Sequence, residues 1–186
     1  MANNTGGGQG SPLAHCEFEV SPFNSHLWGN IEATIYEEGG NQPTSIIGCD
    51  QPWYVLIKWC VFGHMVHHLC GEWCVCVYLE SIGPSPEYRL PEPCIRIPME
   101  PCAPSQDQAR EVNNVRVYCG VAFDGTPFCC YELKVRVPPG GVQCDPCGSL
   151  YLVGVTLTSF DSCRRPGHIG AFCRDATVML YDPANA

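Results

Sequence analysis

Alternation of apolar and polar residues along most of the chain restricts the possible fold more than any other feature of the sequence. Cys16, Phe18 and Val20 alternate with Glu17 and Glu19, and a period of two residues is typical of a strand with one buried face. Comparable alternation, or a short apolar run between turn residues, recurs down the chain. Strands are therefore predicted at residues 16–20, 31–36, 53–62, 73–82, 94–99, 115–123, 128–137, 150–158 and 171–181.

Local patterns refine this prediction. Trp53–Phe62 is apolar on both faces, which is typical of a central strand, whereas Cys94–Met99 lies among prolines and suits a sheet edge. Asp124-Gly125 supplies the positive φ angles of a tight hairpin between two predicted strands. The one helix candidate, Gln106–Val112, is about two turns long and begins with a capping-box pattern.

Roughly nine strands, at most one short helix and proline-rich connections indicate an all-β protein, an antiparallel β-sandwich. The chain resembles an immunoglobulin-like sandwich at the level of the fold, because a tryptophan stands on a central strand (Trp59 or Trp73) and cysteines stand on neighbouring strands. The resemblance covers residues 12–183 and implies no function, because sandwiches support many unrelated activities. We expect the glycine-rich residues 1–11 to form a flexible arm and residues 12–186 to form one domain.

The chain contains 15 cysteines, spread over its whole length. Even spreading favours disulfides, because each bridge can join distant segments and restrict the unfolded chain. An odd number leaves at least one thiol outside intrachain pairs, and the sequence does not determine which cysteines pair. The candidates for intrachain bridges in this disulfide-rich domain are Cys49, Cys60, Cys74, Cys76, Cys94, Cys102, Cys119, Cys144, Cys147, Cys163 and Cys173.

Three further cysteines are candidates for a link between subunits. Cys129 and Cys130 are adjacent in a predicted strand, so their side chains point to opposite faces and do not bridge each other. One of them can serve the core and the other the surface, where it could cross-link subunits, but two separate intrachain bridges are the favoured interpretation. Cys16 follows the flexible arm directly, and it is the first choice for an inter-chain disulfide or contact.

Residues 60–76 hold the densest group of cysteines and histidines. Cysteine and histidine are the ligands that zinc and copper prefer, so His64, His67, His68 and Cys70 form an alternative metal site, with His64 and His68 on one face of a helical turn. The spacing of a CxxC and HxxxH zinc motif is missing, however. We therefore expect a loop with exposed histidines between two strands of a hairpin, and no metal.

Sequence motifs for catalysis are mostly missing. Cys144-Asp-Pro-Cys147 is similar to the redox motif of thioredoxins, but it precedes a strand near Leu150 rather than a helix, so a loop disulfide or an inter-chain link is expected instead. The sequence has no Gly-x-Ser-x-Gly, no HExxH and no phosphate-binding glycine loop. These patterns predict a protein that is not an enzyme and uses no cofactor.

Charge and hydropathy exclude several classes of partner. Lys and Arg number 10 against 19 Asp and Glu, a net charge of −9, which disfavours nucleic acid because there is little positive field to attract phosphates. No apolar run approaches the roughly 18 residues of a membrane-spanning helix. The N-terminal residues lack the charged and apolar regions of a signal peptide. The cysteine content nevertheless favours an extracellular or surface location reached by another route, with a reduced cytoplasmic form as the alternative.

The function expected from these patterns is structural. A hardened β-sandwich with edge strands, an odd cysteine count and no catalytic motif suits a non-enzymatic subunit that self-associates as a homo-oligomer or filament, in a surface, coat or filament assembly. The alternative is a Cys/His metal-binding module centred on residues 60–76.

Overall fold

The computed structural model describes residues 15–22, 25–99, 109–112 and 114–185. This part of the chain forms eleven strands and two single-turn 3-10 helices. The elements are β1 (His15–Val20), β2 (Trp28–Glu37), β3 (Ile46–Gly48), β4 (Trp53–Phe62), η1 (Val66–His68), β5 (Glu72–Ser81), β6 (Tyr88–Pro98), β7 (Arg110–Val112), β8 (Val115–Val121), β9 (Pro127–Val137), β10 (Ser149–Phe160), β11 (Pro166–Tyr181) and η3 (Pro183–Asn185).

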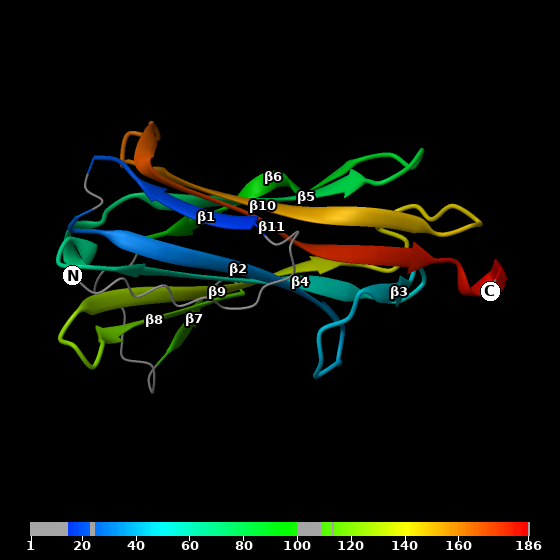
Figure 1. The fold of residues 1–186 in the computed structure, drawn as a ribbon, viewed down its shortest axis with the longest axis horizontal. Helices are drawn as coiled ribbons and strands as arrows, with labels where there is room; N and C mark the ends of the chain where they lie inside the picture. The colour runs from blue at the N-terminus through cyan, green and yellow to red at the C-terminus, as the bar shows by residue number, and fades with distance from the viewer. Residues whose placement is uncertain (1–14, 23–24, 100–108, 113, 186) are drawn as a thin grey trace, which may run out of the picture.

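The strands form two sheets that pack as two layers (Figure 1). The first sheet has the order β1-β11-β10-β5-β6, and β3 also pairs with β11. The second sheet has the order β2-β4-β9-β8-β7. All pairs are antiparallel except β3 with β11, which is parallel. The predicted all-β, two-sheet, disulfide-rich fold is therefore confirmed.

The core lies between the sheets and centres on three aromatic residues. Trp59 on β4, Trp73 on β5 and Tyr131 on β9 are each at most 1% exposed. The rings of Trp59 and Tyr131 stack with centroids 5.0 Å apart, and Trp73 meets Trp59 edge-on at 6.4 Å. Alternate residues of each strand point inward, so the tryptophans from the two sheets meet in the middle. Both tryptophans that suggested the sandwich therefore lie in its core.

Two elements differ from the sequence-based prediction. The short strands β3 and β7 are not among the nine predicted segments, and Arg110–Val112 forms β7 where a helix is predicted over Gln106–Val112. The rest of that helix segment lies outside the described residues. An isolated helix of two turns is only marginally stable. As a strand, β7 instead forms backbone hydrogen bonds with β8. The connection between the two strands is short, and Asn114 within it adopts a φ of 64°.

The helical content of the chain bears on membrane insertion. Within the described ranges, no helix has the length and apolar character to span a bilayer.

Candidate functional site

Ten cysteines lie in pairs at disulfide distance. Four of the five pairs join neighbouring strands of the same sheet, and the fifth joins the loop after β3 to the loop before β10. The bridges are Cys16–Cys173, Cys49–Cys144, Cys60–Cys130, Cys76–Cys94 and Cys119–Cys129. Immunoglobulin domains instead link their two sheets with a disulfide. Four of the bridges therefore strengthen a single layer, and the fifth joins two loops that each connect one layer to the other.

The three cysteines expected to link subunits all have partners within the chain. Cys16 stands opposite Cys173 in the register of β1 and β11. On β9, Cys129 bridges its register partner Cys119 on β8, while Cys130 bridges its register partner Cys60 on β4. The side chains of Cys129 and Cys130 diverge as adjacent strand residues must, but a neighbouring strand on each side supplies a partner. The structure therefore shows the two separate intrachain bridges at Cys129 and Cys130, and at Cys16 a bridge to the body of the domain in place of the inter-chain link.

Four cysteines in the described part of the chain are unpaired: Cys70, Cys74, Cys147 and Cys163. The last three were candidates for intrachain bridges, and Cys102 lies outside the described residues. Because Cys144 bridges the loop after β3, the CxxC motif does not close on itself. Thiols at Cys70, Cys147 and Cys163 are exposed, whereas Cys74 is half-buried.

The histidine segment connects the two sheets and is not the predicted hairpin. It leaves β4 in the second sheet and enters β5 in the first sheet, so the two strands do not pair. Buried Val66 anchors the 3-10 turn, and His64, His67 and His68 are exposed. Among the described residues, three potential ligand atoms gather within 4.8 Å only at Cys74, Cys76 and Cys94, a group that includes none of these histidines and does not include Cys70. His64, His67, His68 and Cys70 are therefore not among the residues whose ligand atoms gather in the described part of the chain.

Replacing the three exposed histidines of this segment tests their role. The triple variant His64→Ala, His67→Ala, His68→Ala should change the free energy of unfolding by no more than about 0.5 kcal/mol, which is typical of surface substitutions. Urea denaturation of both proteins measures the difference, and elemental analysis after dialysis is its control. Stoichiometric zinc or copper in the parent protein, lost in the variant, would instead support the metal-binding module.

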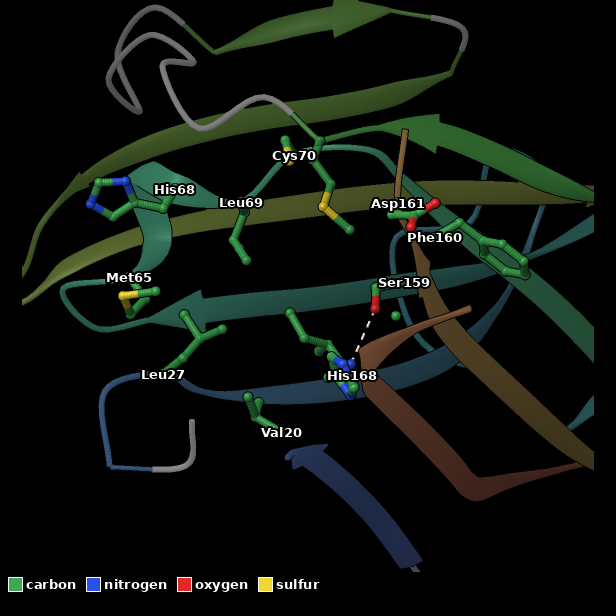
Figure 2. A pocket seen from close by; sticks show the side chains of 13 residues that line it. Val20, Leu27, Met65, His68, Leu69, Cys70, Ser159, Phe160, Asp161 and His168 are labelled. Carbon is green, nitrogen blue, oxygen red and sulfur yellow. Dashed lines mark hydrogen bonds between the residues drawn. The ribbon is translucent and has the colours of Figure 1, made fainter. Parts of the chain in front are cut away.

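An apolar cavity of about 330 Å³ opens beside this segment, and Figure 2 shows its lining. Val20, Leu27 and Leu69 contribute apolar walls, while His68 and Asp161 lie on opposite sides. The cavity combines a thiol, two histidines and a carboxylate, the residue types of nucleophilic catalysis. Its lining residues are Val20, Leu27, Met65, His68, Leu69, Cys70, Met99, Ser159, Phe160, Asp161, Gly167, His168 and Ile169.

The carboxylate of this cavity is committed to its own turn. The backbone N–H of Arg165 donates to Asp161 Oδ1 at 2.9 Å, the backbone N–H of Cys163 donates at 2.8 Å, and the Arg165 guanidinium pairs with Oδ2 at 2.9 Å. These interactions hold the pKa of the Asp161 carboxyl below its ordinary value, and the hydrogen bond from the Arg165 backbone N–H has the largest effect. Asp161 therefore organises the turn between β10 and β11.

Large apolar side chains gather at one end of the sandwich, where Trp28, Val121 and Phe123 are exposed and Phe62 and Phe128 are half-buried. Trp28 on β2, Phe62 on β4 and Phe128 on β9 are neighbours in register on the outer face of the second sheet. Their ring centroids are 6.3 and 6.1 Å apart. The hairpin between β8 and β9, which Phe128 follows, carries two further exposed residues: Val121, whose parity in β8 is opposite to that of Phe128's partner Gly120, and Phe123, which is fully exposed. We call these five residues the hairpin patch.

A second exposed apolar group crosses the outer face of the first sheet. Ile46 on β3 is the register partner of Met179 on β11, which is opposite Leu150 on β10. Ile82 continues the group beyond β5, because its N–H bonds to the carbonyl of Leu150. All four side chains are at least 40% exposed. We call them the C-terminal row, since they lie at the end of the sandwich where β11 finishes (Figure 1).

Charged pairs cover the middle of the second sheet's outer face. Glu32, Lys58, Glu132 and Arg116 stand side by side across four strands. Lys58 lies 3.5 Å from Glu32, and Arg116 lies 3.6 Å from Glu132. This alternation satisfies the charges within one chain. The exposed apolar surface of this sheet is consequently concentrated at its hairpin end.

Reasoning from the sequence missed both apolar groups. The members of the C-terminal row come from positions as far apart as Ile46 and Met179, so only strand pairing brings them together. A signal was present in each strand, because Leu150 and Met179 occupy outward positions that alternation assigns to polar residues.

Comparisons with known proteins add no relative. No family model, no curated protein and no solved structure matches this chain. The functional argument consequently rests on the chain's own surface and chemistry.

Proposed function

We propose that this chain is a non-enzymatic structural subunit that associates end to end with copies of itself. One observation carries the proposal. Of the eight large hydrophobic side chains exposed in the described part of the chain, seven belong to the hairpin patch or the C-terminal row, and Phe172 is the exception. The two groups lie on different sheets at opposite ends of the long axis (Figure 1).

Burial of these groups favours a chain of subunits over a single closed contact. Contiguous apolar surface on a water-soluble domain is typical of an interaction site. Contact at only one end would leave the other group exposed, whereas contact at both ends covers the two groups in every internal subunit. Repeated contact of this kind produces a filament or a layer when the arrangement does not close on itself.

The disulfides support the same proposal. Bridges within each sheet hold the strands that carry the two groups, so little conformational entropy remains to be lost when a neighbour binds. Cys60–Cys130 links β4 to β9 inside the hairpin end, and Cys119–Cys129 links β9 to β8. Because five bridges persist only in an oxidising setting, we place the assembled form outside the cytosol, on a cell or particle surface.

Substitution at each end tests the proposal. Phe123→Ser removes the most exposed member of the hairpin patch, and Met179→Ser removes a central member of the C-terminal row. Sedimentation velocity over micromolar concentrations, without reductant, should show species larger than a dimer for the parent chain. Each contact in such a head-to-tail chain joins the hairpin patch of one copy to the C-terminal row of the next, so either variant impairs every contact, and the affinity of association should fall at least tenfold, about 1.4 kcal/mol.

Phe172→Ser provides the matched control. Phe172 is 39% exposed on the outer face of the first sheet and belongs to neither group, so this variant should assemble as the parent does. The proposal is wrong if the parent chain remains a monomer throughout the concentration range. It is also wrong if Phe172→Ser reduces assembly as much as Phe123→Ser does.

A further inference from the structure

Three sulfur atoms meet on the outer face of the first sheet. Cys74 and Cys76 are two residues apart on β5, and Cys94 lies on the neighbouring strand β6. The Sγ atoms of all three lie within 4.8 Å of one another. Cys76 and Cys94 form the disulfide, and Cys74 is the unpaired, half-buried thiol.

An irregularity in β6 produces this arrangement. Val75 pairs with Ile95 and Val77 pairs with Leu90, so four residues of β6 stand opposite Cys76 alone. Two of these four residues are prolines, which lack the N–H that a regular ladder uses. The extra length places Cys94 against Cys76. Cys94 also lies two residues from Arg96, the register partner of Cys74, and therefore on the same face as the free thiol.

A guanidinium group accompanies the sulfurs. Arg89 Nη2 lies 2.6 Å from Cys94 Sγ and 3.7 Å from Cys76 Sγ. A nearby cation stabilises a thiolate relative to a thiol, and a more stable thiolate is a better leaving group. If the bridge between Cys76 and Cys94 opens, Arg89 is in position to stabilise the sulfur that is released.

We propose that Cys74, Cys76 and Cys94 form a thiol–disulfide exchange site. The Cys74 thiolate attacks Cys94 Sγ, a bond forms between these two sulfurs, and the Cys76–Cys94 bond breaks with its electron pair on Cys76. The proton lost by Cys74 to solvent is regained at Cys76. One disulfide and one thiol are present before and after, so the step needs no oxidant or reductant.

Exchange changes which thiol faces the solvent. Cys74 is half-buried, whereas Cys76 is only 6% exposed. In the form with free Cys74, the unpaired thiol is accessible to an external thiol or disulfide reagent. In the form with free Cys76, the unpaired thiol is buried and reacts more slowly. The site therefore controls the reactivity of one surface thiol at the edge of the first sheet, independently of the end-to-end association proposed above.

Mapping of alkylated cysteines tests the exchange. Oxidised parent protein, treated with iodoacetamide without reductant, should carry label on Cys74 and, more slowly, on Cys76, and none on Cys94. Fragment-ion sequencing distinguishes the two positions. In Cys76→Ser, Cys74 and Cys94 should form the alternative bridge and both escape labelling. The matched control Cys163→Ser removes another unpaired thiol and should leave the parent distribution unchanged.

Two results would overturn the proposal. One is label on both Cys74 and Cys94 in folded, oxidised Cys76→Ser. The other is parent protein that, after acid quenching, denaturation and alkylation, contains only the Cys76–Cys94 bridge and labelled Cys74, a result that decides the question even if the variant does not fold. Arg89→Gln examines the positioning role of the guanidinium, and labelling of Cys76 should slow at least tenfold. Equal rates would remove Arg89 from the mechanism.

Discussion

Replacing Trp59 with alanine should lower the free energy of unfolding by about 3–5 kcal/mol. Trp59 is completely buried, stacks on Tyr131 and meets Trp73 edge-on between the two sheets. Its removal leaves a cavity lined by rigid strands, which cannot move together to fill the space. Urea denaturation of the oxidised protein, followed by fluorescence and circular dichroism, measures the change.

Trp28→Ala is the matched control for this experiment. Trp28 also lies in the second sheet, on the strand next to β4, but its side chain is 46% exposed. The same substitution there should cost about 1 kcal/mol or less, because much of the apolar surface already contacts water. Equal losses for the two tryptophans would contradict a core centred on Trp59.

Removing the bridge between β1 and β11 should have the next largest effect. In the double variant Cys16→Ser, Cys173→Ser, the unfolded chain loses a cross-link between residues 157 positions apart. Constraint of so long a loop stabilises the folded state by about 4–5 kcal/mol in the chain-entropy description. The thermal midpoint and the urea midpoint should both fall, and the variant should retain the β-sheet signal in circular dichroism.

The bridge between β8 and β9 serves as the comparison. Cys119 and Cys129 are separated by only 10 positions, so removing both should cost about 3 kcal/mol. The difference between the two double variants isolates the contribution of loop length, since both bridges join adjacent antiparallel strands. Equal destabilisation would show that local packing, and not restriction of the unfolded chain, accounts for these disulfides.

The periodicity of individual segments was readable from the sequence. Trp53–Phe62 is apolar on both faces and forms β4, between β2 and β9. Asp124-Gly125 forms the hairpin turn, in which Gly125 has a φ of 85° and the Ala122 N–H bonds to the Thr126 carbonyl. The strand and the position of the turn were predicted correctly, because side-chain alternation and turn geometry depend on residues that are close in the chain, although only Gly125 of the Asp-Gly pair has a positive φ.

Side-chain alternation could not predict the short strands. Three residues, as in β3 or β7, do not establish a period of two. Ile46–Gly48 becomes a strand because the end of β11 offers it a free edge, and the order of strands in a sheet is not a local property. The same limitation explains the histidine segment, where two successive strands enter different sheets.

The sequence by itself determined that this chain folds into strands, that a tryptophan stands on a central strand and that most of its cysteines have the opportunity to pair. Only the tertiary structure decided the partners. Cys16 meets Cys173 and Ile46 meets Met179 because β11 lies beside both β1 and β3, although more than 100 residues separate each pair in the sequence. The physical reason is that alternation is set by the backbone of each strand, whereas strand order is set by how all the apolar faces are buried at once.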